Sequence, residues 1–359
     1  MKRYTYILLY EFAPLDSRDL RGGKIIIDRL IRRITHKFNV YVITGDNFRW
    51  KKPLRLAYWF NVFLAGLKVI RILLKHKEMP TILMFQGTYG ELVSLIVKIL
   101  FPKIKMVSIF WHYEPRVTHK RGLIKILSVI ITTFEENLRG IAFRFIYNKV
   151  LTLTKSAARM VYKYYSLPLS KIEILGCSFD RFPINKNIKK DFDYLFIGHL
   201  KKAEDLIKIW PKLLLLKPSA KLLIAGPYKG AENVYKKLIS LPNIEYHGFI
   251  SPSKRSEIYS KAKVLLFPTK REGWCMTIAE ALWAGLSVVS WDIPTLREVY
   301  NTCKAVYLVP IGNYNFFVKS AIKALEEHST LSEKATKWSS KIPNWNEIAN
   351  NFLKIISKI

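Results

Sequence analysis

Short runs of apolar residues alternate along the chain with longer runs in which apolar residues recur every three or four positions. Residues 24–37 illustrate the longer kind, because Ile27, Leu30 and Ile34 share one helical face while arginines occupy the others. The first half predicts strands at residues 4–10, 39–44, 81–86, 105–110, 149–153 and 172–175, and helices at 24–37, 54–76, 90–100 and 155–165.

The second half repeats this alternation of strands and helices. Its pattern predicts strands at residues 193–197, 220–225, 263–267, 286–290 and 305–309, and helices at 203–217, 230–239, 253–261, 276–284 and 314–327. Strands that alternate with helices form parallel sheets with right-handed crossovers, so two such series predict an α/β protein of two doubly wound domains.

The domain boundary is expected near residues 178–190, a polar and basic stretch that Pro183 interrupts. We therefore expect one domain at residues 1–180 and a second at 181–344. Ligands of open α/β sheets bind beyond the carboxyl ends of the strands, so the site is expected in a cleft between the two domains.

Composition places the chain among folded proteins with an anionic partner. Half of the 359 residues are apolar, which excludes a disordered protein. The formal net charge of +32 predicts a partner that carries phosphate, an anionic lipid surface or a nucleic acid. The three cysteines match no metal-ligand spacing, and their odd number argues against a disulfide framework.

No stretch reaches about 18 uncharged apolar residues, so the sequence predicts no membrane-spanning helix. The first residues lack the features of a signal peptide and are interpreted as a buried strand. We therefore expect an intracellular, cytoplasmic protein.

Positive charge is concentrated in the first half, where residues 1–180 carry 31 Lys and Arg against 12 Asp and Glu. Basic clusters there lie beside aromatic residues such as Trp50 and Trp59, a composition that suits an anionic bilayer or a polyprenyl-phosphate acceptor. For the helix at 54–76 the favoured alternative is an ordinary crossover helix whose Lys68 and Arg71 are solvated. For residues 112–140 both interpretations stay open.

Residues 264–300 carry the most informative pattern. A buried strand is followed by a loop with Glu272 and Gly273, and then by a helix that bears Glu280. The backbone N–H groups of residues 273–277 begin that helix and have no partner within it, so they form a ready anion site. Two carboxylates beside such a site are suited to accept hydrogen bonds from sugar hydroxyls.

The spacing E-G-x6-E, followed by A-x-x-x-G-x-x-V-V and D-x-P-x-x-x-E, resembles glycosyltransferase family 4. Members of that family are retaining enzymes with the GT-B fold, in which two Rossmann-like domains face a central cleft. The resemblance implies that Glu272 contacts the donor sugar and that Glu280 binds the ribose of the nucleotide. It also implies an amide cradle for the sugar and diphosphate, formed by Gly273, Trp274, Cys275, Met276 and Thr277.

The resemblance extends to other segments of the chain. Gly22 and Gly23 are similar to the glycine loop that lies against the donor phosphates, and His112 to a catalytic strand-end histidine near the donor sugar. His199, Lys201 and Lys202 stand where the family carries an Arg and a Lys that grip the diphosphate. The segment after Trp345, about residues 345–359, resembles the final helix that packs back on the first domain.

These observations predict a retaining hexosyltransferase that moves a sugar from a nucleotide-sugar donor to a hydroxyl or lipid-linked acceptor in glycan or glycolipid assembly, peripherally at the inner membrane face. No D-x-D motif is present, so we expect neither a metal nor another cofactor. One alternative is a relative that binds nucleotide sugars without transferring them, because the Arg near His199 is missing. Another is a basic nucleic-acid-binding protein, although no helix-turn-helix, zinc or RNA-binding motif is present.

Overall fold

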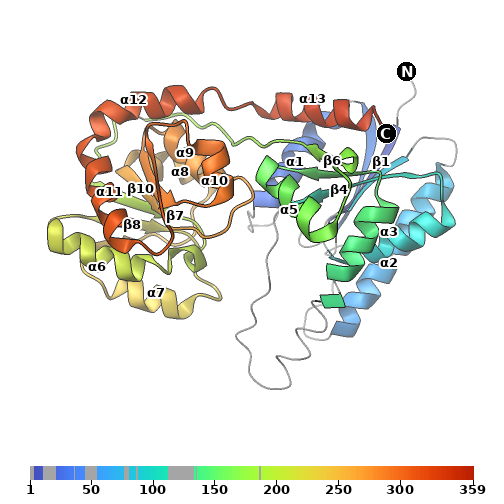
Figure 1. Ribbon diagram of the computed structural model, residues 1–359, viewed down its shortest axis with the longest axis horizontal. Helices are drawn as coiled ribbons and strands as arrows, with labels where there is room; N and C mark the ends of the chain where they lie inside the picture. Colours follow the sequence, from blue (N-terminus) through green and yellow to red (C-terminus); the bar gives the residue numbers. More distant parts are fainter. Residues whose placement is uncertain are drawn as a thin grey trace. The chain divides into compact units, whose positions relative to one another are not determined.

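The computed structural model describes residues 4–10, 22–35, 37–44, 55–76, 81–85, 88–111, 133–134, 136–185 and 187–359. The chain divides into an N-terminal unit, residues 1–177 with 345–359, and a C-terminal unit, residues 178–344. Within the described residues each unit contains a six-stranded, fully parallel sheet with helices between the strands (Figure 1). The two doubly wound α/β domains predicted from the alternation of apolar runs are therefore confirmed.

The sheet of the N-terminal unit has the strand order β2-β1-β3-β4-β5-β6. Its strands are β1 (Tyr4–Tyr10), β2 (Phe38–Thr44), β3 (Thr81–Phe85), β4 (Lys105–Phe110), β5 (Lys149–Thr152) and β6 (Ile172–Ile174). Its helices are α1 (Gly22–Ile34), α2 (Arg55–Lys75), α3 (Thr88–Leu100), the π-helical η2 (Ala142–Ile146), α5 (Lys155–Tyr165), the short η3 (Leu169–Lys171) and α13 (Trp345–Ile356).

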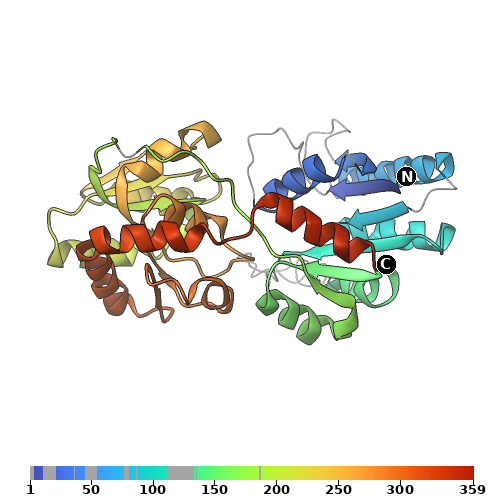
Figure 2. The same cartoon turned by 90° about the horizontal axis from the view of Figure 1, so that it is seen from above.

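Right-handed crossovers distribute these helices over the two faces of the sheet. The chain moves from β1 to β2 in one direction and from β3 to β6 in the other, so α1 covers one face and α2, α3 and α5 cover the opposite one. The core beneath the second group includes Val69, Val97, Met106 and Val161, all buried. Figure 1 and Figure 2 both place α13, in red, beside α1, in blue, on the first face.

The last helix is fixed to the N-terminal unit by an apolar stripe and by two backbone contacts. Ile348, Phe352 and Ile355 recur at helical spacing and are buried. The Asn351 side chain donates hydrogen bonds to the carbonyl oxygens of Ile174 and Leu175, at 3.1 and 2.9 Å. The end of the chain thus completes the unit that the start of the chain forms.

The sheet of the C-terminal unit has the strand order β12-β11-β10-β7-β8-β9. Its strands are β7 (Phe192–Ile197), β8 (Leu222–Ala225), β9 (Ile244–Tyr246), β10 (Ala262–Phe267), β11 (Ser287–Trp291) and β12 (Val306–Val309). Its helices are η4 (Leu200–Ala203), α6 (Leu206–Leu216), α7 (Glu232–Ile239), η5 (Pro252–Lys254), α8 (Arg255–Ser260), α9 (Met276–Trp283), α10 (Pro294–Tyr300), α11 (Tyr314–Glu326) and α12 (His328–Ser339).

Three elements of this unit were not predicted from the sequence pattern. Strand β9 has only three residues and lies at the sheet edge, too short to show an alternation. Helix α10 spans seven residues, and its first residue is Pro294. Helix α12 buries one residue per turn, namely Leu331, Ala335 and Ser339. Of these only Leu331 is a large apolar residue, so the sequence shows no apolar period there.

Candidate functional site: two carboxylates at a strand switch point

The chain order of the C-terminal sheet reverses between β7 and β10. From β7 the chain runs outward through β8 to β9, and then returns to the other side of β7 as β10. The loops that follow β7 and β10 therefore diverge and leave a crevice at the carboxyl edge, where open α/β sheets bind their ligands. The predicted residues Lys202 and Glu272 lie in these two loops.

Glu272 is held at this switch point from two elements. Its Oε1 accepts a hydrogen bond of 2.6 Å from Lys202 Nζ and one of 2.8 Å from the Thr269 hydroxyl. The Glu272 side chain is 10% exposed and the Lys202 side chain 40% exposed, and the ammonium also lies 5.7 Å from the centre of the Phe267 ring. A lysine has three donors, so Lys202 can keep its bond to Glu272 and still donate to a phosphate.

Glu280 lies on α9 and is held by two side chains of α8. Its Oε1 accepts from Arg255 at 2.7 Å and its Oε2 from the Tyr259 hydroxyl at 2.9 Å. Burial raises the pKa of Glu280 above its usual value, while the Arg255 charge and the Tyr259 hydrogen bond oppose that rise and Asp180 adds to it. Each carboxylate oxygen has a second lone pair, so the bonds to Arg255 and Tyr259 leave acceptor capacity for a ligand hydroxyl.

The backbone that joins the two acids turns sharply at Cys275. This residue has φ +74° and ψ 74°, the left-handed conformation that favours glycine, and it directly precedes the first residue of α9. Its sulfur lies near the Ile278 N–H but makes no capping hydrogen bond, so the N–H groups at the start of α9 can still donate to another acceptor. An anion is the acceptor that such a helix start attracts.

Tyr300 of α10 holds the turn at Cys275 in place. Its hydroxyl donates to the Cys275 carbonyl at 2.7 Å, and its ring lies 5.9 Å from the ring of the buried Trp274. Burial, followed by the charge of Glu272, raises the pKa of the Cys275 thiol well above its usual value. The thiol is therefore neutral near pH 7 and acts as a packed side chain, not as a reactive one.

The loops after β7 and β8 approach each other closely at two glycines. Gly226 has φ +134°, and a Cβ added to it would lie 1.9 Å from the Gly198 carbonyl oxygen. His199 Nδ1 accepts from the Lys201 N–H at 3.2 Å, so Nε2 is the protonated nitrogen and donates to the Lys229 carbonyl at 3.1 Å. The His199 ring thus links the loop after β7 to the loop after β8 through hydrogen bonds to their backbone groups.

The other predicted donor residues lie outside this cluster. Lys201 is exposed, and its Nζ lies near Gly230, at 3.3 Å from where a Cβ on that glycine would be. Gly22 and Gly23 are the first residues of α1, in the N-terminal unit. His112 lies outside the described residues. Within the part of the chain that the structure describes, no group of His, Cys, Asp and Glu could hold a metal ion.

Sequence reasoning did not find the residues that orient the two acids. Arg255, Tyr259 and Thr269 carry no motif, and only the fold brings them to Glu280 and Glu272. A further anchor, Asp205, accepts from Trp291 Nε1 at 2.9 Å and pairs with Lys270 at 2.8 Å, which fixes the loop before Glu272. The spacing of four between Arg255 and Tyr259 places both on one helix face, but it does not identify their partner.

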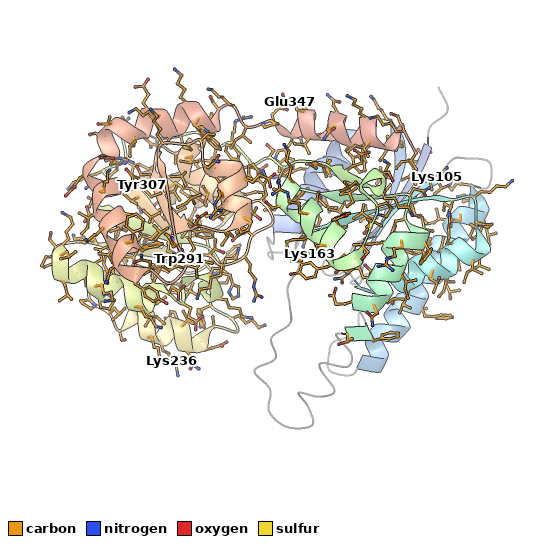
Figure 3. The ribbon with its side chains drawn as sticks, in the orientation of Figure 1. Lys105, Lys163, Lys236, Trp291, Tyr307 and Glu347 are labelled. Carbon is orange, nitrogen blue, oxygen red and sulfur yellow. The ribbon has the colours of Figure 1, made fainter. Side chains whose placement is uncertain are left out.

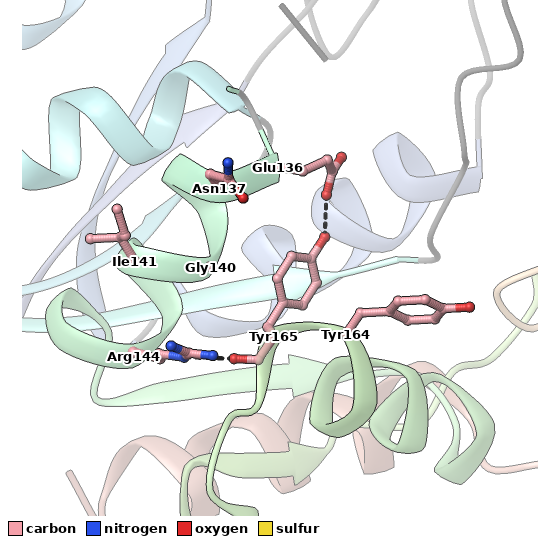
Figure 4. A pocket seen from close by; sticks show the side chains of 7 residues that line it. All are labelled: Glu136, Asn137, Gly140, Ile141, Arg144, Tyr164 and Tyr165. Atoms are coloured by element: carbon pink, nitrogen blue, oxygen red, sulfur yellow. Dashed lines mark hydrogen bonds between the residues drawn. The ribbon is translucent and has the colours of Figure 1, made fainter. Parts of the chain in front are cut away.

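The N-terminal unit contains a separate pocket with a volume of about 470 Å³. Figure 4 shows the Tyr165 hydroxyl bonded to Glu136 and the Arg144 guanidinium bonded to the Tyr165 carbonyl. Helix α5 runs antiparallel to β5, so its last residues, including Tyr165, lie toward the amino edge of the sheet. The pocket is therefore away from the carboxyl edge, where the sequence predicts the donor.

Comparison with protein families and curated proteins finds glycosyltransferases that are similar to this chain. The family model "Glycosyl transferases group 1" matches residues 179–345. An uncharacterized glycosyltransferase of Methanocaldococcus jannaschii is 26% identical in an alignment of 172 residues that covers 42% of this chain and 44% of that protein. An uncharacterized glycosyltransferase of Haemophilus influenzae is 23% identical over 297 residues, which are 80% of this chain and 76% of that protein.

Solved structures share the fold along nearly the whole chain. Sucrose-phosphate synthase of Thermosynechococcus elongatus is 12% identical with a TM-score of 0.80, covering 99% of both chains. HepE of Anabaena, in complex with UDP and glucose, is 13% identical with a TM-score of 0.72, covering 99% of this chain and 100% of its own. At these identities the likeness shows the fold, and it confirms the GT-B architecture expected from the sequence.

Proposed function

We propose that this chain, a glycosyltransferase whose residues 179–345 form a glycosyl transferases group 1 domain, moves a hexose from a nucleoside diphosphate sugar to a hydroxyl with retention of configuration. The observation that carries the proposal is the pair of positioned carboxylates, Glu272 and Glu280, on either side of an uncapped helix start at the strand switch point.

The chemistry of the site suits the three parts of such a donor. The ionised Glu280 accepts hydrogen bonds from the ribose hydroxyls. The N–H groups at the start of α9, with Lys202, hold the diphosphate, because both the helix start and an ammonium favour negative charge. Glu272 accepts from the hydroxyls of the sugar. The complex of HepE with UDP and glucose supports a donor of this class.

Transfer with retention needs the acceptor oxygen on the face that the diphosphate leaves. In the proposed step, the bond from the sugar's C1 to the diphosphate oxygen breaks and a bond from C1 to the acceptor oxygen forms on the same face. The acceptor proton passes to the leaving phosphate, which yields a nucleoside diphosphate and a glycoside. The amides of α9 and Lys202 stabilise the charge that develops on the leaving group. The step uses no metal or other cofactor.

The acceptor proposed from the sequence is a hydroxyl compound or a lipid-linked one, with the protein held peripherally at the cytoplasmic face of a membrane. No helix among the described residues is long and apolar enough to cross a bilayer. The concentration of positive charge in residues 1–180 supports an anionic acceptor or surface.

Calorimetric titration with nucleoside diphosphates, followed by a screen of nucleotide sugars for diphosphate release, tests the proposal. We expect one nucleoside diphosphate to bind and its sugar to be turned over in the presence of acceptor lipids. Binding without turnover would favour the non-transferring relative. Duplex DNA that binds more tightly than every nucleotide, with a steep salt dependence, would favour the nucleic-acid alternative.

A further inference from the structure

Helix α2 carries two apolar stripes, of which only one faces the sheet. Ala65, Val69 and Leu73 recur every four residues and are buried in the core of the N-terminal unit. Phe63 and Leu67, with Leu74 two turns further on, form the second stripe, and Phe63 is 58% exposed. The helix is therefore the packed crossover helix that the sequence favours, yet it also presents apolar side chains to the outside.

Helix α3, which packs against α2, presents apolar side chains in the same way. Ile96, Ile99 and Leu100 are exposed, and Ile99 is 71% exposed. A Cβ on Gly66 of α2 would lie 4.0 Å from the Val93 side chain of α3, so the two helices are in close contact. Figure 1 shows them side by side on the face of the sheet opposite α13. Together their exposed apolar residues form what we call the α2–α3 face.

Cations border the α2–α3 face. Lys68, Arg71 and Lys75 follow each other at helical spacing on α2, beside the outer stripe, and all three are exposed. Residues 55–77 contain no acidic residue. Lys103 is exposed just after α3, and Lys105, labelled in Figure 3, is exposed at the start of β4. An apolar stripe with a cationic border is the arrangement of helices that lie in the interface of an anionic membrane.

We propose that the α2–α3 face docks the protein on an anionic lipid bilayer, with the apolar side chains among the acyl chains and the cations at the headgroups. Charge selects this occupant over a second copy of the chain, because two copies would each bring a net charge of +32 to the contact. The reason for such docking, which is to bring the enzyme to a lipid-linked acceptor, rests on the proposed function.

Vesicle co-sedimentation of the full chain tests the proposal, with phosphatidylcholine vesicles that contain or lack phosphatidylglycerol. The apolar variant is Leu67→Glu with Ile99→Glu, and the charge variant is Lys68→Glu with Arg71→Glu and Lys75→Glu. Matched controls in the C-terminal unit are Leu215→Glu with Leu216→Glu, of which Leu215 is 82% exposed, and Lys212→Glu with Lys236→Glu and Lys237→Glu, all exposed.

We expect the native chain to bind only the anionic vesicles and to be released by high salt. Each variant of the α2–α3 face should bind at least about tenfold more weakly, while both controls bind as the native chain does. Unchanged thermal unfolding and nucleoside diphosphate affinity would show that the variants are folded, and this affinity tests the donor site independently.

Two results would overturn the proposal. One is native vesicle binding by both variants of the α2–α3 face. The other is a dimer in light scattering that the apolar variant dissociates, since the face would then pair with a second copy.

Discussion

Glu272 and Glu280, the two carboxylates of the candidate site, are each held by a cation and a hydroxyl, but on different elements. Glu280 is buried between α8 and α9, where Arg255 and Tyr259 occupy one lone pair on each oxygen. Glu272 accepts hydrogen bonds on one oxygen from the partly exposed Lys202 and from Thr269. Both acid side chains are almost fully buried, but the cation that holds Glu272 is 40% exposed and the one that holds Glu280 is 14% exposed, so we expect a more rigid acceptor at Glu280 than at Glu272.

Glu280→Ala is expected to weaken the binding of free nucleoside diphosphate about ten- to hundredfold. Hydrogen bonds to a charged acceptor contribute roughly 1.5–3 kcal/mol, and the ribose hydroxyls would lose theirs. Calorimetric titration of the diphosphate and of the intact nucleotide sugar measures the effect, which should be similar for both ligands. An unchanged diphosphate affinity would refute the ribose role of Glu280.

Glu272→Gln is expected to lower turnover by at least about tenfold, or about 1.4 kcal/mol of barrier, and to leave diphosphate affinity nearly intact. The amide keeps the shape of the side chain but removes the negative charge that we propose stabilises a cation-like sugar in the transition state. Steady-state turnover and diphosphate titration on one preparation separate the two effects. Glu327→Gln, which alters a carboxylate bonded to Tyr307 of the edge strand β12, is the control. Loss of diphosphate binding in Glu272→Gln would place Glu272 in the nucleotide site.

The pH dependence of nucleotide binding is expected to report on Arg255. Burial raises the pKa of Glu280 and Arg255 lowers it, so Arg255→Gln should raise this pKa further. Glu280 accepts best when ionised, so the affinity of the variant relative to native should fall as the pH drops through the raised pKa, and recover above it. Taking the ratio removes the titration of the ligand itself. A ratio of affinities that does not change with pH would contradict the role of Arg255 in keeping Glu280 ionised. Tyr259→Phe should shift the pH profile of this ratio less than Arg255→Gln does.

At the scale of elements, the site depends on how closely the loops after β7 and β8 approach. Gly198 and Gly226 have positive φ angles, and no side chain fits at Gly226 beside the Gly198 carbonyl oxygen. Gly226 also donates to the Gly248 carbonyl and accepts from the Tyr246 hydroxyl, so its position is fixed from both sides. The position of η4, and with it of Lys202, follows from this contact.

Gly226→Ala is expected to lower the unfolding temperature far more than Gly312→Ala. Both glycines have positive φ angles, which an alanine adopts at a cost of about 1–3 kcal/mol. Only at position 226 does the new Cβ overlap a carbonyl oxygen, because nothing lies within 4 Å of a Cβ at 312. Thermal unfolding and diphosphate titration measure both variants. Equal unfolding temperatures of the two variants would show that the loops after β7 and β8 can move apart without loss of stability.

At the scale of the whole molecule, the chain returns to its first unit after it has built the second. Helix α13 closes the face of the N-terminal sheet that α1 covers, while the residues proposed to bind the donor's ribose, diphosphate and sugar, Glu280, Lys202 and Glu272, belong to the C-terminal unit. We therefore expect that mutation can separate the stability of the first unit from the nucleotide binding proposed for the second.

Phe352→Ala is expected to destabilise the N-terminal unit by about 3–5 kcal/mol, because the Phe352 side chain is fully buried. Hydrogen exchange of the N-terminal sheet measures the loss. Diphosphate affinity should stay within about twofold of native at low temperature, since no donor-site residue of the C-terminal unit is altered. A large fall in that affinity would show that the two units are coupled.

The existence and type of most elements could be predicted because each buries a face whose period is local to the sequence. Both sheets follow from that pattern, and so does the neighbourhood of Glu272 and Glu280, which lie on one loop and the helix it enters. The elements of the C-terminal unit that were missed, β9, α10 and α12, are too short or too weakly apolar to show a period, and only their tertiary contacts hold them.

By itself, the sequence of this protein determined the two α/β domains, the glycosyltransferase resemblance and the pair of acids. Periodicity and motif spacing depend on residues that are close along the chain, so they can be read without the fold. The partners of those acids were decided only by the tertiary structure, because Lys202 is 70 residues from Glu272 and Arg255 is 25 residues from Glu280. The same holds for the α2–α3 face, since a pattern of apolar residues does not tell which of two stripes the core covers.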